Sequence, residues 1–214
     1  MLTEVETLHP IEVRVLGALL EKDIATPEYY PLTVNSLQNA CNQKSSREPL
    51  VSYDETTVQR ALELLKNKGF VIRVSGAGHR VEKYGHRLGE KLNLGRRELA
   101  LLCVLMLRGP QTTGELRGRT ERMHDFADVD EVERVLESLA SLAEPLVARA
   151  PRGRWVQLLG GQPEPSTESD IAPTAVPVSK VEERIVALDR EVSQLKQQVA
   201  QLQQQFEGFR RQFE

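Results

Sequence analysis

The sequence predicts a mainly α-helical protein with small β hairpins, which places it in the α+β class. Three observations predict this. Apolar residues recur at helical spacing in several separate segments, and two groups of such segments are each followed by a β-branched run that turns back on itself. The end of the chain carries an unbroken heptad pattern, which is typical of a coiled-coil helix.

The segment from Asp54 to Lys68 carries the clearest helical signal. Asp54 is a suitable N-cap, because its carboxylate can accept hydrogen bonds from the free amides of the first turn, and Gly69 is a suitable end. The apolar stripe follows the i, i+3, i+4, i+7 spacing and consists of Val58, Ala61, Leu62 and Leu65. The opposite face is polar and is expected to stay exposed.

The elements around this helix follow the order of a winged-helix module. A first helix is expected from about Pro10 to Lys22, and a short helix capped by Thr33 follows two prolines that interrupt the pattern. After the main helix, FVIRV from Phe70 and RVEKYGHRL from Arg80 are expected to form a hairpin with SGAGH at its tip. Helix, turn, helix and hairpin together predict a winged helix over residues 8–90.

The same order recurs later in the chain. ELALLCVLMLRG from Glu98 resembles EVRVLGALLEK from Glu12, and VERVLESL from Val132 resembles VQRALELL from Val58. LVARAPRGRWVQLL from Leu146 supplies a second hairpin. This repetition predicts a second winged-helix domain over residues 95–159.

The remainder is predicted to be a flexible linker followed by an oligomerisation helix. Residues 160–177 are rich in Gly, Pro, Ser and Thr, which is typical of a disordered linker. Residues 178–214 show the heptad pattern and favour a parallel two-stranded coiled coil, although phenylalanines at the end leave a higher oligomer open. The seam consists of Val181, Ile185, Leu188, Val192, Leu195, Val199, Leu202, Phe206 and Phe209.

Composition excludes several classes of protein. The net charge of −3 argues against coating nucleic acid or anionic lipid through bulk charge. Cys41 and Cys103 lack paired spacing, so we predict reduced thiols in a cytoplasm, and the acidic start has no signal-peptide pattern. LALLCVLML from Leu99 is shorter than the roughly 20 residues of a membrane span.

No catalytic or metal-binding pattern emerges from the sequence. The histidines show no metal-ligand spacing, and we find no phosphate-binding glycine loop, nucleophile elbow or pair of catalytic carboxylates. We therefore expect a non-enzymatic protein without cofactor or metal.

Positive charge is concentrated in the second half of the first module. If the loop after Cys41, the main helix and the hairpin share one side, their cations converge into a surface for DNA. The candidate nucleic-acid-binding residues are Lys44, Ser45, Ser46, Arg47, Thr56, Thr57, Gln59, Arg60, Arg73, Arg80, Lys83 and Arg87.

Each part of this candidate surface also has a structural interpretation. The polar loop can satisfy its own backbone, and Arg60 can pair locally with Glu63 on an ordinary solvated helix face. Hairpins commonly carry Lys and Arg to protect their edges. In the second module, the exposed face of the helix around Val132 is acidic and would repel phosphate.

Several runs resemble the signature runs of the YceH family of bacterial proteins. They are RVLGALLEK from Arg14, TPEYYPLTVNSLQNACNQKSSREP from Thr26, YGHRL from Tyr84 and LMLRGPQTTGELRGRTERM from Leu105. The match covers nearly residues 8–158. The resemblance implies a bacterial tandem winged-helix protein without an established activity, and it assigns no binding residues.

Two hypotheses follow for function. The first is a cytoplasmic DNA-binding protein, a transcriptional regulator or nucleoid-associated factor, which contacts DNA mainly through the first module and pairs with itself through the coil. The second is a protein-interaction scaffold whose tandem winged helices dock protein partners without binding DNA. The first depends on the convergence of cations between residues 44 and 87, which the fold must provide.

Overall fold

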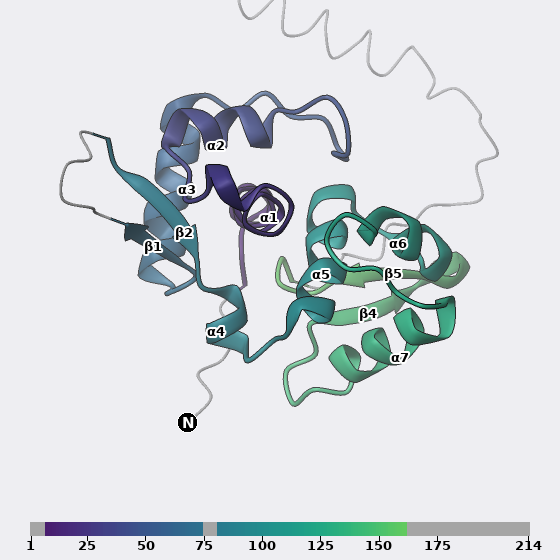
Figure 1. Cartoon of the computed structure of the whole chain (residues 1–214). Coiled ribbons are helices and arrows are strands. Elements are labelled where there is room, and N and C mark those ends of the chain that lie inside the picture. The colour runs from purple at the N-terminus through teal and green to yellow at the C-terminus, as the bar shows by residue number, and fades with distance from the viewer. Residues whose placement is uncertain (1–6, 75–80, 162–214) are drawn as a thin grey trace, which may run out of the picture. The chain divides into compact units, whose positions relative to one another are not determined.

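A computed structural model of the chain describes residues 7–74 and 81–161. All of them belong to one compact unit, and they form seven α-helices and two small antiparallel sheets, so the predicted α+β class is confirmed (Figure 1). The predicted coil at 178–214, almost all of the predicted linker and Arg80 lie outside the described residues.

The N-terminal segment forms three helices and a hairpin, as its periodicity predicts. Thr33 and Asp54 cap α2 and α3 as expected, since each side chain accepts a hydrogen bond from the amide three residues later. Gly69 follows α3 with φ +73°, a left-handed conformation that suits glycine. The elements are α1 (Pro10–Ala25), the 3-10 turn η1 (Pro27–Tyr29), α2 (Val34–Cys41), α3 (Glu55–Asn67), β1 (Val71–Val74) and β2 (Lys83–His86).

The hairpin of the N-terminal segment is held against the preceding chain. β1 pairs antiparallel with β2, and Leu32 forms an isolated bridge with Tyr84, with N to O distances of 2.8 and 3.1 Å. The imidazole of His86 lies between an Asp23 carboxylate oxygen, 3.2 Å from Nε2, and the Leu88 amide, which donates to Nδ1. The end of β2 is therefore tied to the end of α1.

The connection between the two segments contains a helix that the sequence did not indicate. The predicted modules leave residues 91–94 between them, but α4 (Leu88–Leu92) covers the end of the first module and the beginning of this connection. Leu88 is completely buried, and Asn93 ends the helix with φ 52°. Five residues carry too little periodicity to predict such a helix, which forms because Leu88 packs into the core.

The C-terminal segment repeats the order of helices and hairpin. Its sheet has the strand order β3-β5-β4, and Arg152 and Gly153 turn the hairpin with positive φ. The elements are α5 (Arg96–Arg108), β3 (Gln111–Thr112), α6 (Thr113–Thr120), α7 (Val129–Ala140), β4 (Val147–Ala150), the 3-10 turn η2 (Pro151–Gly153) and β5 (Arg154–Gln157).

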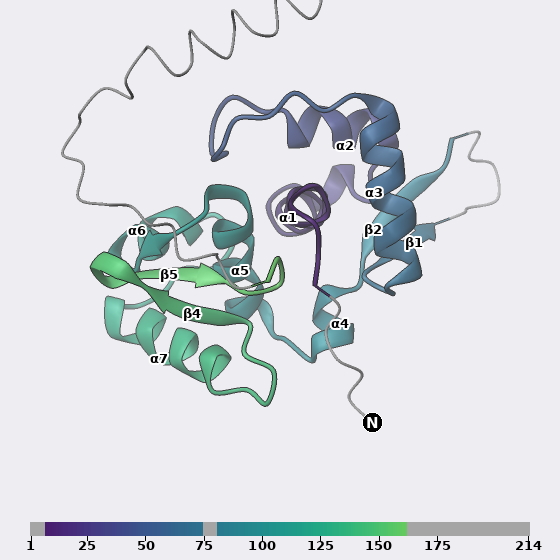
Figure 2. The same cartoon turned by 180° about the vertical axis from the view of Figure 1, so that it is seen from behind.

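The two segments share one core, and α1 and α5 form its centre (Figures 1 and 2). Both helices are buried on nearly every side over much of their length, from Glu12 to Leu20 in α1 and from Ala100 to Leu107 in α5. They approach closely at Gly17, where a Cβ would lie 3.1 Å from atoms of both Met106 and Leu107. Among the described helices, none combines the length and the hydropathy needed to cross a bilayer.

Candidate functional site

The loop between α2 and α3, which was expected to face nucleic acid, is built around a buried arginine. Arg47 has no exposed side-chain surface and holds both carboxylate oxygens of Glu21, at 2.6 and 3.0 Å. The same guanidinium donates to the Ala40 and Ser46 carbonyls and to the Gln43 side chain. This arrangement does not favour the prediction that Arg47 binds nucleic acid, because its donors are used inside the protein.

A second buried arginine supports this loop from α1. Arg14 donates to the Pro49 carbonyl at 2.6 Å and to the Cys41 carbonyl at 3.3 Å. Burial, followed by repulsion from Arg47, lowers the pKa of Arg14. The two arginines thus satisfy the backbone carbonyls of the loop, which was the structural interpretation of this polar run.

The loop docks on the C-terminal segment rather than beside the hairpin. The Glu48 amide donates to the Leu107 carbonyl at 2.8 Å, and Arg108 donates to the Ser46 hydroxyl. Lys44 and Ser45 are exposed, but they line a groove with residues of α5 and α6. Figures 1 and 2 show the loop reaching towards α5 and α6, whereas β1 and β2 lie on the opposite side of α3.

Two of the described candidate cations on the hairpin side are paired with carboxylates. Arg73 meets Glu82 at 2.5 Å and Arg87 meets Glu90 at 2.7 Å. Lys83 and Arg60 form no ion pair with any described residue. The expected convergence of cations into one face is therefore not found among the described residues.

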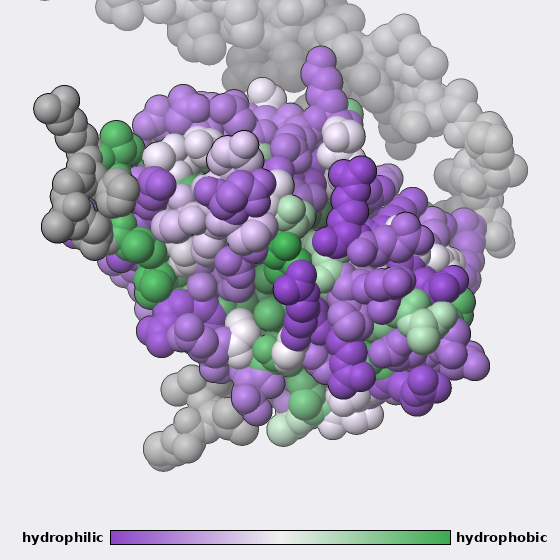
Figure 3. Space-filling view, viewed as in Figure 1, coloured by the Kyte–Doolittle hydropathy of each residue, from purple (hydrophilic) through white to green (hydrophobic). Residues whose placement is uncertain are grey.

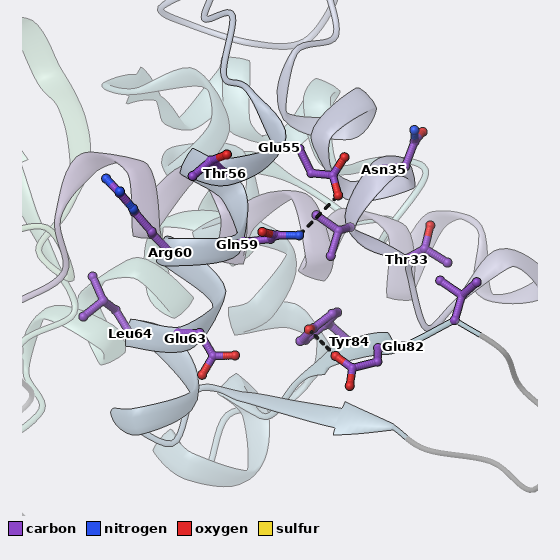
Figure 4. Close-up of a pocket in the computed structure, with 12 residues that line it drawn as sticks. Thr33, Asn35, Glu55, Thr56, Gln59, Arg60, Glu63, Leu64, Glu82 and Tyr84 are labelled. Atoms are coloured by element: carbon purple, nitrogen blue, oxygen red, sulfur yellow. Dashed lines mark hydrogen bonds between the residues drawn. The ribbon is translucent and has the colours of Figure 1, made fainter.

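The structure instead forms a groove between α3 and the hairpin, which we call the α3 groove (Figure 4). It has a volume of about 920 Å³. The predicted residues Thr56, Gln59 and Arg60 line it, whereas the Thr57 amide donates to Asp54. The full lining comprises Thr33, Val34, Asn35, Glu55, Thr56, Gln59, Arg60, Glu63, Leu64, Val81, Glu82 and Tyr84.

Carboxylates outnumber cations in the α3 groove. Glu55, Glu63 and Glu82 line it against Arg60 alone. In Figure 4 Glu63 points towards Tyr84 and Glu82, and the Tyr84 hydroxyl donates to Glu82 at 3.0 Å. Burial raises the pKa of Tyr84, and the hydrogen bond to Glu82 adds to this shift.

Apolar side chains border the same groove. Leu64 and Val81 line it and are 49% and 60% exposed, whereas the exposed Ile72 and Val74 of β1 lie outside this lining, on the other face of the hairpin. Figure 3 shows hydrophobic surface over the hairpin, beside the grey segment at the left. Exposed apolar side chains next to carboxylates are unusual on a surface that binds phosphate, and they are common where proteins dock.

Sequence reasoning missed the residues that decide the character of this groove. The sequence pattern predicts only a hairpin strand for Val81, Glu82 and Tyr84 and indicates no role for them in a binding site. Their strand position could have indicated it, because β2 lies opposite the exposed face of α3 in any helix-hairpin module of this order.

Comparison with known proteins identifies the family. The family model described as "Protein of unknown function, DUF480" matches residues 8–154. The chain belongs to the DUF480 family. This match spans both segments that form the shared core, so the family relationship covers the α3 groove and the Arg47 loop alike.

Curated relatives of this DUF480 protein are bacterial and carry the name UPF0502 protein. One from Geobacter sulfurreducens is 51% identical over 195 residues, covering 87% of this chain and 89% of the relative. One from Opitutus terrae is 50% identical over 193 residues, covering 87% and 82%. One from Citrifermentans bemidjiense is 56% identical over 164 residues, covering 74% and 76%. The prediction of an uncharacterised bacterial family is thereby confirmed, while the narrower YceH resemblance stays a prediction.

Proposed function

We propose that the chain is a non-enzymatic protein-interaction scaffold built from two tandem winged helices, and that the α3 groove is its principal docking surface. The order α1, α2, α3, β1, β2 and its repetition as α5, α6, α7, β4, β5 support the tandem winged helices. In such a module the exposed face of the third helix and the hairpin form the contact surface.

The observation that carries the proposal is the charge of the α3 groove. Three carboxylates line it, and Glu63 and Glu82 also neutralise nearby Lys66 and Arg73. DNA binding depends on unpaired cations that replace the counterions of phosphate. Here Arg73 is paired with Glu82 and Lys66 with Glu63, and three carboxylates outnumber Arg60 in the lining, so the formal charge of the groove is negative and opposes a phosphate backbone.

The same charge and the apolar border define the partner. A protein segment with apolar side chains would cover Leu64 and Val81, and flanking Lys or Arg residues would meet Glu55, Glu63 and Glu82. Apolar anchors at the centre and charged pairs at the rim are the usual anatomy of a specific protein interface. The partner surface is therefore expected to be basic and apolar.

The experiment is co-purification from cells with the tagged full chain, followed by direct binding of the identified partner. Leu64→Glu and Val81→Glu place a charge on the apolar border and are expected to weaken partner binding at least tenfold. Leu142→Glu is the matched control, since Leu142 is an exposed leucine in the turn after α7. A partner that binds the Leu64→Glu and wild-type chains equally well would refute docking at this groove.

Binding to DNA through α3 is the second candidate. Thr56, Gln59 and Arg60 are exposed on the face of α3 that would meet base edges, and Arg60 is free of ion pairs with the described residues. A gel shift with mixed genomic DNA at low salt tests it. Retardation that falls steeply with salt and is lost in Arg60→Ala would favour DNA binding over the scaffold.

Self-association completes the proposal. The heptad pattern over residues 178–214 supports a parallel coiled coil that pairs two chains. Pairing two weak docking sites raises the apparent affinity, because the second contact becomes effectively intramolecular. Sedimentation of the full chain against Leu188→Pro and Leu195→Pro variants measures this, and a monomeric wild-type chain would refute it.

A further inference from the structure

A second groove, separate from the α3 groove, lies between the Arg47 loop and the C-terminal segment. We call it the basic groove. It is bordered by the end of α1, by residues 43–46 and by residues of α5 and α6. Its volume is about 830 Å³. Small-molecule sites commonly measure about 300–1,000 Å³, so its size suits a ligand comparable to a nucleotide.

Cations dominate the basic groove. Five basic residues line it, namely Lys22, Lys44, Arg108, Arg119 and Arg122, against only two acidic residues, Glu21 and Glu121. The charge of Glu21 is already matched, because Arg47 holds both of its carboxylate oxygens, and Arg119 pairs with Glu115 at 3.5 Å, outside the lining. Lys44, Arg108 and Arg122 form no ion pair with any described residue. Although the net charge of the chain is −3, positive charge is concentrated in this groove.

Arg108 shows that part of this charge is not compensated. Its guanidinium donates to the Ser46 hydroxyl, and no carboxylate among the described residues lies within ion-pair distance of it. Burial, followed by the charge of Arg119, lowers the pKa of Arg108. A bound anion would relieve both effects, since it supplies the missing opposite charge.

The loop is fixed in the conformation that borders the groove. Ser46 has φ 60°, which non-glycine residues rarely adopt, and its carbonyl accepts a hydrogen bond from Arg47 at 2.9 Å. The Glu48 amide is tied to Leu107 on α5. The groove is therefore formed before any ligand binds, which lowers the entropic cost of binding.

Apolar side chains line the groove together with the cations. They are Val104, Leu107 and Met123. An inorganic anion would use only the cations, whereas a ligand with a charged group and an organic ring system would use both parts of the lining. Three arginines favour phosphate, because the planar guanidinium can offer two donors to its oxygens and stays charged at any physiological pH.

We propose that the basic groove binds a phosphate ester of nucleotide size, with its phosphates on Arg108, Arg119 and Arg122 and its organic part against Leu107 and Met123. A duplex is the less suitable ligand, because its grooves are read by a protruding helix or strand and this site is recessed. The inference goes beyond the docking function, and it rests on different residues.

The test is calorimetric titration of the full chain at low salt with ATP, pyrophosphate and adenosine as probes. We expect ATP to bind more tightly than pyrophosphate and adenosine not to bind measurably. Arg119→Gln and Arg122→Gln should each weaken ATP binding by roughly 10-fold to 100-fold, because each removes a charge-assisted hydrogen bond. Arg134→Gln is the control, since Arg134 is an exposed arginine on α7 away from the groove.

Three results would overturn the proposal. The first is that neither ATP nor pyrophosphate binds up to millimolar concentration. The second is that ATP still binds the Arg119→Gln and Arg122→Gln double variant as tightly as the wild type. The third is that an oligonucleotide binds at these arginines and ATP does not compete with it. Leu64→Glu should leave ATP binding unchanged, because Leu64 lies in the α3 groove. Failure of the docking proposal and failure of this one are therefore distinguishable.

Discussion

Replacement of Arg47 by alanine tests whether this arginine stabilises the fold or binds a ligand. The substitution leaves the Glu21 carboxylate without the guanidinium that holds both its oxygens, and it leaves the Ala40 carbonyl without that donor. Removing one member of a buried ion pair typically costs about 3–5 kcal/mol. We therefore expect a large loss of stability for a residue in a surface loop.

The local surroundings set the magnitude within that range. The Glu21 side chain is 19% exposed, so water can hydrate part of the carboxylate, and Lys22 lies 3.8 Å from it. Both reduce the penalty for the unpaired charge. The expected cost of Arg47→Ala is accordingly at the lower end, about 3 kcal/mol.

Urea unfolding at neutral pH measures this cost. With a slope of about 2 kcal/mol/M, a loss of about 3 kcal/mol moves the midpoint down by about 1.5 M. Lys44→Ala is the matched control, because Lys44 is an exposed cation in the same loop and its loss should change stability by less than about 0.5 kcal/mol.

A specific result would refute the reasoning. If Arg47→Ala and Lys44→Ala unfold at the same urea concentration, Arg47 is not a buried clamp. If Arg47→Ala instead keeps its stability and loses affinity for nucleic acid, the original interpretation of this loop as a phosphate contact regains support.

Three further predictions follow from buried groups. Burial lowers the pKa of His86, and Asp23 opposes the shift. The stability that neutral His86 contributes should therefore be present above about pH 6.5 and be lost as pH falls through the lowered pKa. The free energy of unfolding of His86→Gln should depend less on pH over that range. Gly17→Val should destabilise by about 2 kcal/mol or more in thermal unfolding, because it overpacks the α1–α5 contact, whereas Gly114→Ala, with open space around it, should be nearly neutral. Burial raises the pKa of Cys41 to about 12 and also that of Cys103, so neither thiol should react with iodoacetamide at pH 8 until the protein unfolds; rapid native labelling would contradict this.

Local features of the fold could be predicted from the sequence because they depend on neighbouring residues. The apolar stripe of α3, the caps at Thr33 and Asp54 and the hairpin after Gly69 are all confirmed. Each follows from spacing or from the chemistry of one side chain within a turn. The repeat between α1 and α5 was visible for the same reason.

Which charged side chains are paired, buried or exposed could not be predicted, because their partners are distant in sequence. Arg47 meets Glu21, 26 residues earlier, and Arg108 meets Ser46, 62 residues earlier. A count of cations between residues 44 and 87 treats all of them as available. In the fold Arg47 is buried, Arg73 is paired with Glu82, and Lys44 lines a groove with residues of α5 and α6.

Net charge is consequently a poor guide to function for this chain. The chain totals −3, yet it places an excess of carboxylates in the α3 groove and an excess of cations in the basic groove. Averaging over the sequence cancels the charges of these two surfaces, although charged groups act on a ligand mainly at short range. Opposite ligand classes are therefore expected at the two grooves, basic segments at the first and phosphate at the second, and a ligand of one class should not compete with a ligand of the other.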